Sequence, residues 1–300
     1  MLPSWFALAC LLPAAGPADA RDNPVLNDLL NQGVTIGGTA IKLPPPTLAD
    51  GLGAKEQRAA MEQITDASHP LDRLLRRAVV APFVLKLSSE STDSANEPAR
   101  RVDLWFVVYG TLEDVASQDF ANRWSDMAGG KDSSDDLPAR SGELTAEEIA
   151  ERKLDQGLGE DEHFLFSTSN LFERARISAT RQAVVTKTDE SLLVAARVDS
   201  RFDNDSEYSN HWQPLARDKA GKLAAGKAQP YAGASFYAKV TKLAEPAGAL
   251  FVEYHQAFNE PKDWFHGANL LRSKLPILAQ DSVREFRRRL AGEGKGDNEK

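Results

Sequence analysis

The chain has 300 residues, with 36 Lys or Arg, 44 Asp or Glu and a single Cys, and its formal net charge is −8 at pH 7. This acidic balance argues against a nucleic-acid partner, because phosphate binding depends on clustered basic side chains. The one cysteine is Cys10, so the chain after it can form neither a disulfide nor a thiol site. Its stability must come from the burial of side chains.

Residues 1–20 are predicted to be a cleavable secretory signal. Trp5 to Leu12 are almost wholly apolar, and Ala18-Asp19-Ala20 has the small-x-small pattern that signal peptidase recognises. We expect cleavage near Ala20 and a periplasmic or extracellular protein. The apolar run is far shorter than the roughly 20 residues that cross a bilayer, so no transmembrane segment is expected. A lipoprotein signal ending at Cys10 is the disfavoured alternative.

The N-terminal third predicts helices followed by strands. Helix is expected over 23–31, 54–67 and 71–78, where apolar residues recur at helical spacing. Strand is expected over 33–43, 79–87 and 101–109, with Pro44-Pro45-Pro46 ending the first and an exposed loop between the last two. Both faces of 101–109 are largely apolar, which predicts a central strand covered on both sides.

Residues 111–159 are predicted to be a helical insertion or subdomain. Thr111 with Asp114, and Thr145 with Glu148, form capping-box patterns that begin helices to about 127 and 157. Between them, residues 129–141 are rich in Gly, Ser and Asp and predict a mobile loop.

The last third predicts antiparallel strands and a closing helix. Strands are expected over 171–187, 191–198, 234–243 and 249–258, because these segments are rich in β-branched and aromatic residues. Glu245-Pro246-Ala247-Gly248 is a turn pattern that joins the last two as a hairpin. An amphipathic helix is expected to start at Pro276 and to continue to Leu290, and residues 291–300 to be a disordered tail.

This element order resembles the helix-grip fold of START-type lipid-transfer domains and their polyketide-cyclase-like relatives. The local likeness lies between Phe251 and Leu290: Phe258-Asn259-Glu260-Pro261, then Trp264, Asn269-Leu270-Leu271 and Leu275-Pro276, then the long helix. The Gly and second Pro usual in that turn are absent, and the spacing from Pro261 to Asn269 is short. We therefore expect a single α+β domain over 21–300, with an antiparallel sheet curved around the C-terminal helix.

The resemblance implies an apolar cavity between the sheet and the last helix, and hence non-catalytic binding of a hydrophobic or amphipathic small molecule. The predicted lining is Phe236, Val240, Val252, Tyr254 and Phe286, with the Tyr254 hydroxyl able to orient a ligand. The alternative is that the same stripe is ordinary core. No cofactor is expected.

Two other functions stay open. A hydrolase or cyclase-like enzyme would use Glu253 and His255, which share one strand face, with His266 nearby after the turn. No nucleophile accompanies them, so a structural ion pair is the alternative. An envelope scaffold, with protein partners that the sequence does not identify, would use exposed aromatic residues such as Trp212 and Tyr231.

The alternating carboxylates of Asp203, Asp205 and Glu207 are the candidate metal ligands of this sequence, since calcium prefers several oxygens at once. Tyr208 and Pro214 occupy the positions where a calcium loop needs Gly and Glu. The expected interpretation is an acidic surface turn without a metal.

Overall fold

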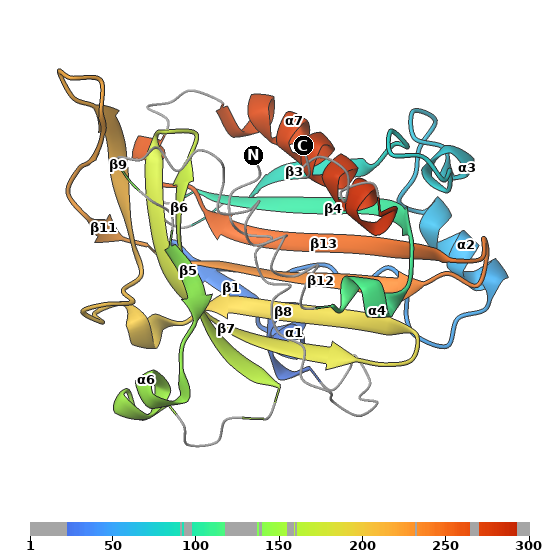
Figure 1. The fold of residues 1–300 in the computed structure, drawn as a ribbon, viewed down its shortest axis with the longest axis horizontal. Coiled ribbons are helices and arrows are strands. Elements are labelled where there is room, and N and C mark those ends of the chain that lie inside the picture. The colour runs from blue at the N-terminus through green and yellow to red at the C-terminus, as the bar shows by residue number, and fades with distance from the viewer. Residues whose placement is uncertain are drawn as a thin grey trace, which may run out of the picture.

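The computed structural model is built on one large antiparallel sheet with helices against both faces (Figure 1). It describes residues 23–90, 92, 98–117, 137, 140–154, 159, 161–231, 233–264 and 270–292. The predicted signal, most of the first helix of the predicted insertion, and residues 293–300 of the tail lie outside this part of the chain. The α+β class with an antiparallel sheet is confirmed.

The elements follow in chain order. The helices are α1 Pro24–Asn31, α2 Ala54–Glu62, α3 Leu71–Leu74, α4 Leu112–Val115, α6 Ala146–Glu151 and α7 Leu270–Leu290, with 3-10 turns η3 Ser200–Phe202 and η4 Lys262–Trp264. The strands are β1 Val34–Ile36, β2 Thr39–Ile41, β3 Val84–Glu90, β4 Ala99–Tyr109, β5 Arg140–Glu143, β6 Glu162–Leu171, β7 Ala175–Lys187, β8 Ser191–Val198, β9 His211–Arg217, β10 Leu223–Ala225, β11 Gln229–Pro230, β12 Ala234–Lys242 and β13 Ala249–Asn259.

The main sheet has 11 strands, and its longest path is β10-β9-β7-β8-β12-β13-β4-β3. β7 is the branch point: residues 175–178 pair with β9, residues 181–187 pair with β8, and the other edge of β7 pairs with β6. β1 and β2 form a separate hairpin. The predicted hairpin of the last two strands is confirmed, with Ala234 opposite Phe258 and Lys242 opposite Leu250.

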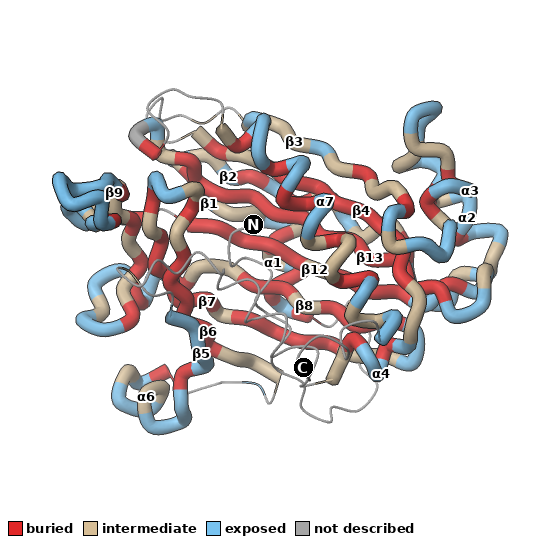
Figure 2. Tube along the Cα trace, turned by 45° about the horizontal axis from the view of Figure 1, so that its top comes forward, coloured by how far each residue is buried: buried red, intermediate tan, exposed pale blue. Residues whose placement is uncertain are grey.

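Both faces of the sheet are covered (Figures 1 and 2). α7 contacts β3 and β4 on one face, which we call the α7 face. The opposite face, which we call the N-terminal face, packs against α1, the β1–β2 hairpin, α2 and α3. Alternate residues of β4 belong to the two faces, and residues 102–108 are all buried, as expected for a strand covered twice.

α7 is held to the sheet by apolar packing and by a buried arginine. Val283 and Phe286 lie in the core, and the rings of Phe286 and Phe106 meet edge to face with centroids 5.5 Å apart. Arg287 follows Phe286 in the chain. Its guanidinium donates to the carbonyl oxygens of Val107 at 2.9 Å, Val79 at 3.2 Å, Pro82 at 3.1 Å and Ala81. Burial lowers the pKa of Arg287 to about 10.

Pro82 explains why β3 begins at Val84 and not at Val79 as predicted. Val84 pairs with Trp105, so the register places Pro82 opposite Val107. Proline has no backbone N–H to donate, and the ladder cannot continue there. Arg287 Nε donates to the Val107 carbonyl instead, and its two Nη groups bind the carbonyls of the 79–82 segment.

Other boundaries differ from the predictions. Pro276 lies inside α7 and does not begin it; its side chain is exposed, and packing on both sides of it holds the helix continuous. Residues 33–43 form the β1–β2 hairpin and not one strand, because Gly37 and Gly38 have positive φ angles and reverse the chain. Residues 140–141, predicted as loop, join β5 because β6 supplies a pairing edge.

The helices α2, α3 and α6 are also shorter than the sequence predicts. α2 ends at Glu62, α3 at Leu74 and α6 at Glu151, although the capping boxes at Thr111 and Thr145 are both formed. Short helices depend on tertiary packing and not on propensity, and α6 has no buried residue.

Replacing Arg287 with Met should lower the free energy of unfolding by about 3 kcal/mol, because four carbonyl groups lose a charged donor. Chemical denaturation would measure the change. The matched control is Arg288→Met, whose side chain is 51% exposed and which should change stability by less than about 0.5 kcal/mol. Equal losses in both variants would contradict this role of Arg287.

Candidate functional site

The five predicted ligand-lining residues lie together on the α7 face. Phe236 and Val240 come from β12, Val252 and Tyr254 from the neighbouring β13, and Phe286 from α7. All five are buried in one apolar cluster. The Phe236 and Tyr254 rings lie 5.6 Å apart. The alternation predicted from the sequence therefore brought these side chains to one place, in the core beneath the last helix.

Polar groups interrupt this apolar face next to Tyr254. Burial raises the pKa of the Tyr254 hydroxyl, and the charge of Arg181 opposes that shift. Arg181 comes from β7, is buried, and donates from Nη1 to Ser167 Oγ at 2.7 Å. Burial lowers the pKa of Arg181. A cation thus lies within the α7 face, and the sequence alone did not single it out, because a lone arginine in a strand carries no pattern.

A pocket of about 410 Å³ opens between β3 and α7. Residues 80–83, which precede β3, and Leu85 of β3 form one wall, and α7 forms the other. The lining is His69, Val80, Ala81, Pro82, Phe83, Leu85, Pro276, Gln280, Val283, Arg284 and Arg287. None of the five predicted residues is among them, although Phe83, Leu85 and Val283 also pack in the cluster that contains those five.

The chemistry of this pocket is apolar with a polar edge. Val80, Phe83 and Leu85 supply apolar surface. On α7, the Gln280 side chain is exposed and the Arg284 side chain is half-buried, and neither side chain makes a hydrogen bond or ion pair within the part of the chain that the structure describes. The pocket therefore combines an apolar wall with a cation and an amide that can form hydrogen bonds to a polar group of a ligand.

The N-terminal face carries the second candidate, built around Glu253 and His255. His255 Nδ1 lies 2.8 Å from Asp103 Oδ1 on β4, and His255 Nε2 lies 3.3 Å from Glu253 Oε2. The Trp105 and Tyr237 rings enclose the imidazole, with centroids 5.1 and 4.7 Å away. His255 is 1% exposed and Glu253 is fully buried. The predicted acid and base are therefore neighbours, sealed inside the protein.

The covering segment is the strap, which we define as residues 44–50. Thr47 donates its backbone N–H to Glu253 Oε2 at 2.7 Å and accepts from Trp105 Nε1 at 3.0 Å. Tyr237 donates its hydroxyl to the Pro44 carbonyl at 2.8 Å. These contacts join the strap to three adjacent strands of the sheet.

A buried lysine completes the attachment of the strap. Lys239 Nζ lies 2.7 Å from the Leu48 carbonyl and 2.8 Å from Asp50 Oδ1. The other oxygen of Asp50 accepts from the hydroxyls of Thr188 and Ser191 at 2.8 and 2.9 Å. Burial raises the pKa of Asp50, but hydrogen bonding and the charge of Lys239 outweigh it, so the net shift is downward. The contacts of Asp50 with Lys239, Thr188 and Ser191 therefore favour its charged carboxylate.

The carboxylate partners of His255 favour the protonated form of its imidazole. Burial alone lowers its pKa, but hydrogen bonds to Asp103 and Glu253 and their charges outweigh burial, and the net shift is upward. The charged groups around it are Asp103, Glu253 and Asp50 as acids, and Lys239 and Arg101 as bases; Arg101 Nε lies 3.2 Å from Asp103.

The stability of the protein should therefore fall as pH rises through the pKa of His255. A histidine whose pKa is raised on folding contributes stability that is complete below its unfolded pKa of about 6.5 and is lost as pH rises through the folded value. Chemical denaturation of wild type and His255→Gln across this pH range would show a difference in their free energies of unfolding, and this difference should become smaller at high pH. The control, His211→Gln, removes a histidine whose Nδ1 contacts Ser209 Oγ at 3.0 Å, and it should not produce such a pH-dependent difference.

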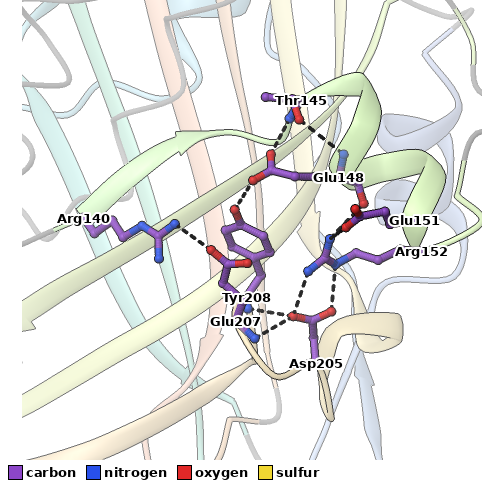
Figure 3. A network of polar contacts seen from close by, with 8 residues as sticks. All are labelled: Arg140, Thr145, Glu148, Glu151, Arg152, Asp205, Glu207 and Tyr208. Atoms are coloured by element: carbon purple, nitrogen blue, oxygen red, sulfur yellow. Dashed lines mark hydrogen bonds and ion pairs between the residues drawn. The ribbon is translucent and has the colours of Figure 1, made fainter.

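The carboxylates considered for a metal have separate partners, and Figure 3 shows those of Asp205 and Glu207. Asp205 pairs with Arg152 at 2.8 Å and accepts the N–H groups of Glu207 and Tyr208. Glu207 pairs with Arg140 at 3.1 Å, and Asp203 accepts from the Asn210 amide. In the described part of the chain, no group of three or more His, Cys, Asp or Glu is placed to hold a metal ion.

The same network includes Glu148 of α6 and Arg152, the residue that follows α6. Arg152 donates to the backbone carbonyl of Glu148 at 2.9 Å, while the Glu148 carboxylate accepts from the Tyr208 hydroxyl. That hydrogen bond raises the pKa of Tyr208 to about 12. The 203–208 turn is thus tied to α6 by side-chain contacts.

Asp205→Asn should lower the free energy of unfolding by about 1–2 kcal/mol, because Arg152 loses its charged partner. Addition of calcium or of a chelator should not move the melting temperature of the wild type. A calcium-dependent rise in melting temperature that Asp205→Asn abolishes would instead establish the metal site.

Two remaining expectations concern aromatic and histidine residues. Trp212 and Tyr231 were expected to be exposed and are buried, at 2% and 3%. Both pack against Trp264, with ring centroids 6.2 and 5.9 Å away, so the exposed aromatic surface expected of a scaffold is not formed by them. His266 lies outside the described residues.

No protein-family model matches this sequence, and no curated protein sequence matches it. Within the described residues, none of the helices has the length and apolar character that crossing a membrane requires.

Proposed function

We propose that this protein binds an amphipathic small molecule with an acidic head group between the sheet and α7, without catalysing a reaction. The observation that carries the proposal is the pocket of about 410 Å³ whose apolar walls end at Arg284 and Gln280. Small-molecule sites have volumes of roughly 300–1,000 Å³ and combine apolar walls with a few polar groups.

The physical fit is that of a medium-length fatty acid or a related amphiphile. Its chain would lie against Val80, Phe83 and Leu85, where each buried methylene contributes about 0.8 kcal/mol. Its carboxylate would meet Arg284, whose guanidinium offers paired donors to an anion. The buried stripe with Phe236 and Tyr254 then serves as the floor that supports the pocket wall.

The proposal includes the helix-grip relationship and export. A sheet that curves around α7 accounts for a pocket at the helix edge, and a secretory signal at residues 1–20 accounts for a chain whose predicted mature part has no cysteine. Both are the interpretations that the sequence favoured.

Binding can be tested with 11-(dansylamino)undecanoic acid, whose fluorescence rises in an apolar site. Arg284→Gln should weaken the acid about tenfold and its uncharged methyl ester much less, because one charged hydrogen bond is worth about 1.5–3 kcal/mol. Gln280→Trp should block both probes by filling the pocket.

The control is Ser273→Trp, which adds the same ring at an exposed position of α7 outside the pocket lining. If the wild type fails to take up either probe, or if Gln280→Trp binds as well as wild type, ligand binding in this pocket is excluded.

Acid–base catalysis is a second candidate, favoured by the contacts of His255 with Asp103 and Glu253. It requires the strap to move, because Thr47 covers Glu253. In a screen of ester substrates, a catalytic role predicts that His255→Gln loses activity at an unchanged melting temperature. Loss of stability without loss of any activity assigns the cluster to the attachment of the strap.

A further inference from the structure

β3 is an edge strand, and its outer side pairs with no other strand in the part of the chain that the structure describes (Figure 1). It pairs with β4 alone, from Val84 opposite Trp105 to Glu90 opposite Ala99. An unpaired strand edge presents a row of backbone N–H and C=O groups, to which an extended chain can bind. The outer edge of β3 is therefore a surface on which a partner strand can pair.

The alternation of hydrogen bonds along β4 shows which residues of β3 face outward. The Gly110 N–H donates to the Gly248 carbonyl at 3.1 Å and continues the register of β4 with β13, so the even-numbered residues of β4 bond to β13. In an antiparallel sheet the odd-numbered residues then bond to the strand on the other side, which is β3. Their partners in β3 are even-numbered, so Leu85, Leu87 and Ser89 direct their N–H and C=O groups outward.

The pocket lies on the face toward which an added strand would direct every second side chain. Leu85 packs on the α7 face and lines the pocket together with Phe83 and Val80. Residues directly opposite each other in an antiparallel pair share a face of the sheet. A residue paired with Leu85 therefore directs its side chain toward α7 and the pocket, where Val80, 72% exposed, adds apolar surface. An apolar side chain fits this position of a partner strand.

The other face of the edge favours an acidic side chain. Lys86 pairs with Asp103 in the β4 ladder, is exposed, and has its Nζ 5.2 Å from the centroid of the Trp105 ring, with no ion pair among the described residues. A lysine on an edge strand opposes a basic partner strand, and an acid directly across from it stabilises the pair. A second copy of β3 offers only Glu90, which already pairs with Arg101 at 3.5 Å. The charge therefore favours a different, acidic strand.

We propose that the outer edge of β3 binds an extended segment of a partner protein in which apolar and acidic residues alternate. The segment adds to the sheet as an antiparallel strand, with its apolar residues opposite Leu85 and Leu87 and an acidic residue opposite Lys86. Backbone hydrogen bonds provide affinity, and the alternate side chains provide specificity. The proposal goes beyond the small-molecule function, because it depends on the strand edge, although both ligands would contact the pocket.

Fluorescence polarisation tests the proposal with the full chain and a fluorescein-labelled peptide of eight alternating Glu and Val residues. Wild type should bind this Glu/Val peptide more tightly than the corresponding Lys/Val peptide. Lys86→Gln should weaken the Glu/Val peptide about threefold, the size of a cross-strand charge pair, and should leave the affinity for a Gln/Val peptide unchanged. The control, Lys219→Gln, removes an exposed lysine outside β3 and should change neither affinity.

N-methylation of the peptide tests the backbone pairing without changing the protein. Methyl groups on the Val nitrogens should abolish binding, because the residues opposite Leu85 and Leu87 donate toward β3. Methyl groups on the Glu nitrogens should leave the affinity within about threefold, because those N–H groups point away from β3. Equal losses for the two methylated peptides, or failure of wild type to bind the Glu/Val peptide, would overturn the proposal.

A proline on the edge separates this proposal from the small-molecule function. Leu87→Pro removes an outward N–H and should weaken the Glu/Val peptide about tenfold, while Leu87→Ala keeps that N–H and should weaken it less. Leu87 does not line the pocket, so both variants should keep wild-type affinity for the dansyl acid.

The outcomes distinguish the two ligands and a second copy of the chain. Peptide binding without uptake of the dansyl acid would retain the strand edge and exclude the small molecule, while uptake without peptide binding would do the reverse. A concentration-dependent dimer of wild type that Leu87→Pro dissociates would assign the edge to a second copy and overturn the acidic partner.

Discussion

The buried guanidinium of Arg287 is the contact on which the candidate site depends. A cation removed from water is costly unless donors and acceptors are matched around it. Here the backbone carbonyls of Val79, Ala81, Pro82 and Val107 supply the acceptors. The contact holds α7 against the edge of the sheet and binds residues 79–82, which Pro82 keeps out of β3. The pocket lies between these two segments, so its shape follows from where this one side chain binds.

The sheet separates two kinds of chemistry by the alternation of its strands. On β12 and β13, Phe236, Val240, Val252 and Tyr254 face α7, while Tyr237, Lys239, Glu253 and His255 face the strap. The α7 face offers apolar area and a pocket. The N-terminal face offers matched charges that hold a segment which has no regular structure of its own. Buried ion pairs of this kind add little net stability but penalise wrong registers, because a shifted strand leaves a charge without its partner.

The strands of the last third were largely predictable from the sequence, and the candidate site only partly. Glu245 to Gly248 predicts a hairpin because turn chemistry is local, and the period of two then assigns every side chain of β12 and β13 to a face. The neighbours of those side chains were not predictable. Glu253 and His255 could be paired on one face, but Asp103 and Thr47 reach them from positions about 150 and 200 residues away. Pro276 predicts a helix start by its local preference, and the packed core beneath α7 outweighed that preference.

By itself, the sequence determined the α+β class, the late hairpin, the capping boxes at Thr111 and Thr145, and the apolar stripe that binds α7. Each depends on residues a few positions apart, whose interactions act in any environment. Only the tertiary structure decided where β3 begins, which side chains seal His255, and that Val80, Gln280 and Arg284 meet around a pocket. These features depend on strand register and on one buried cation, which join segments separated by up to about 200 residues, and no local pattern carries that information.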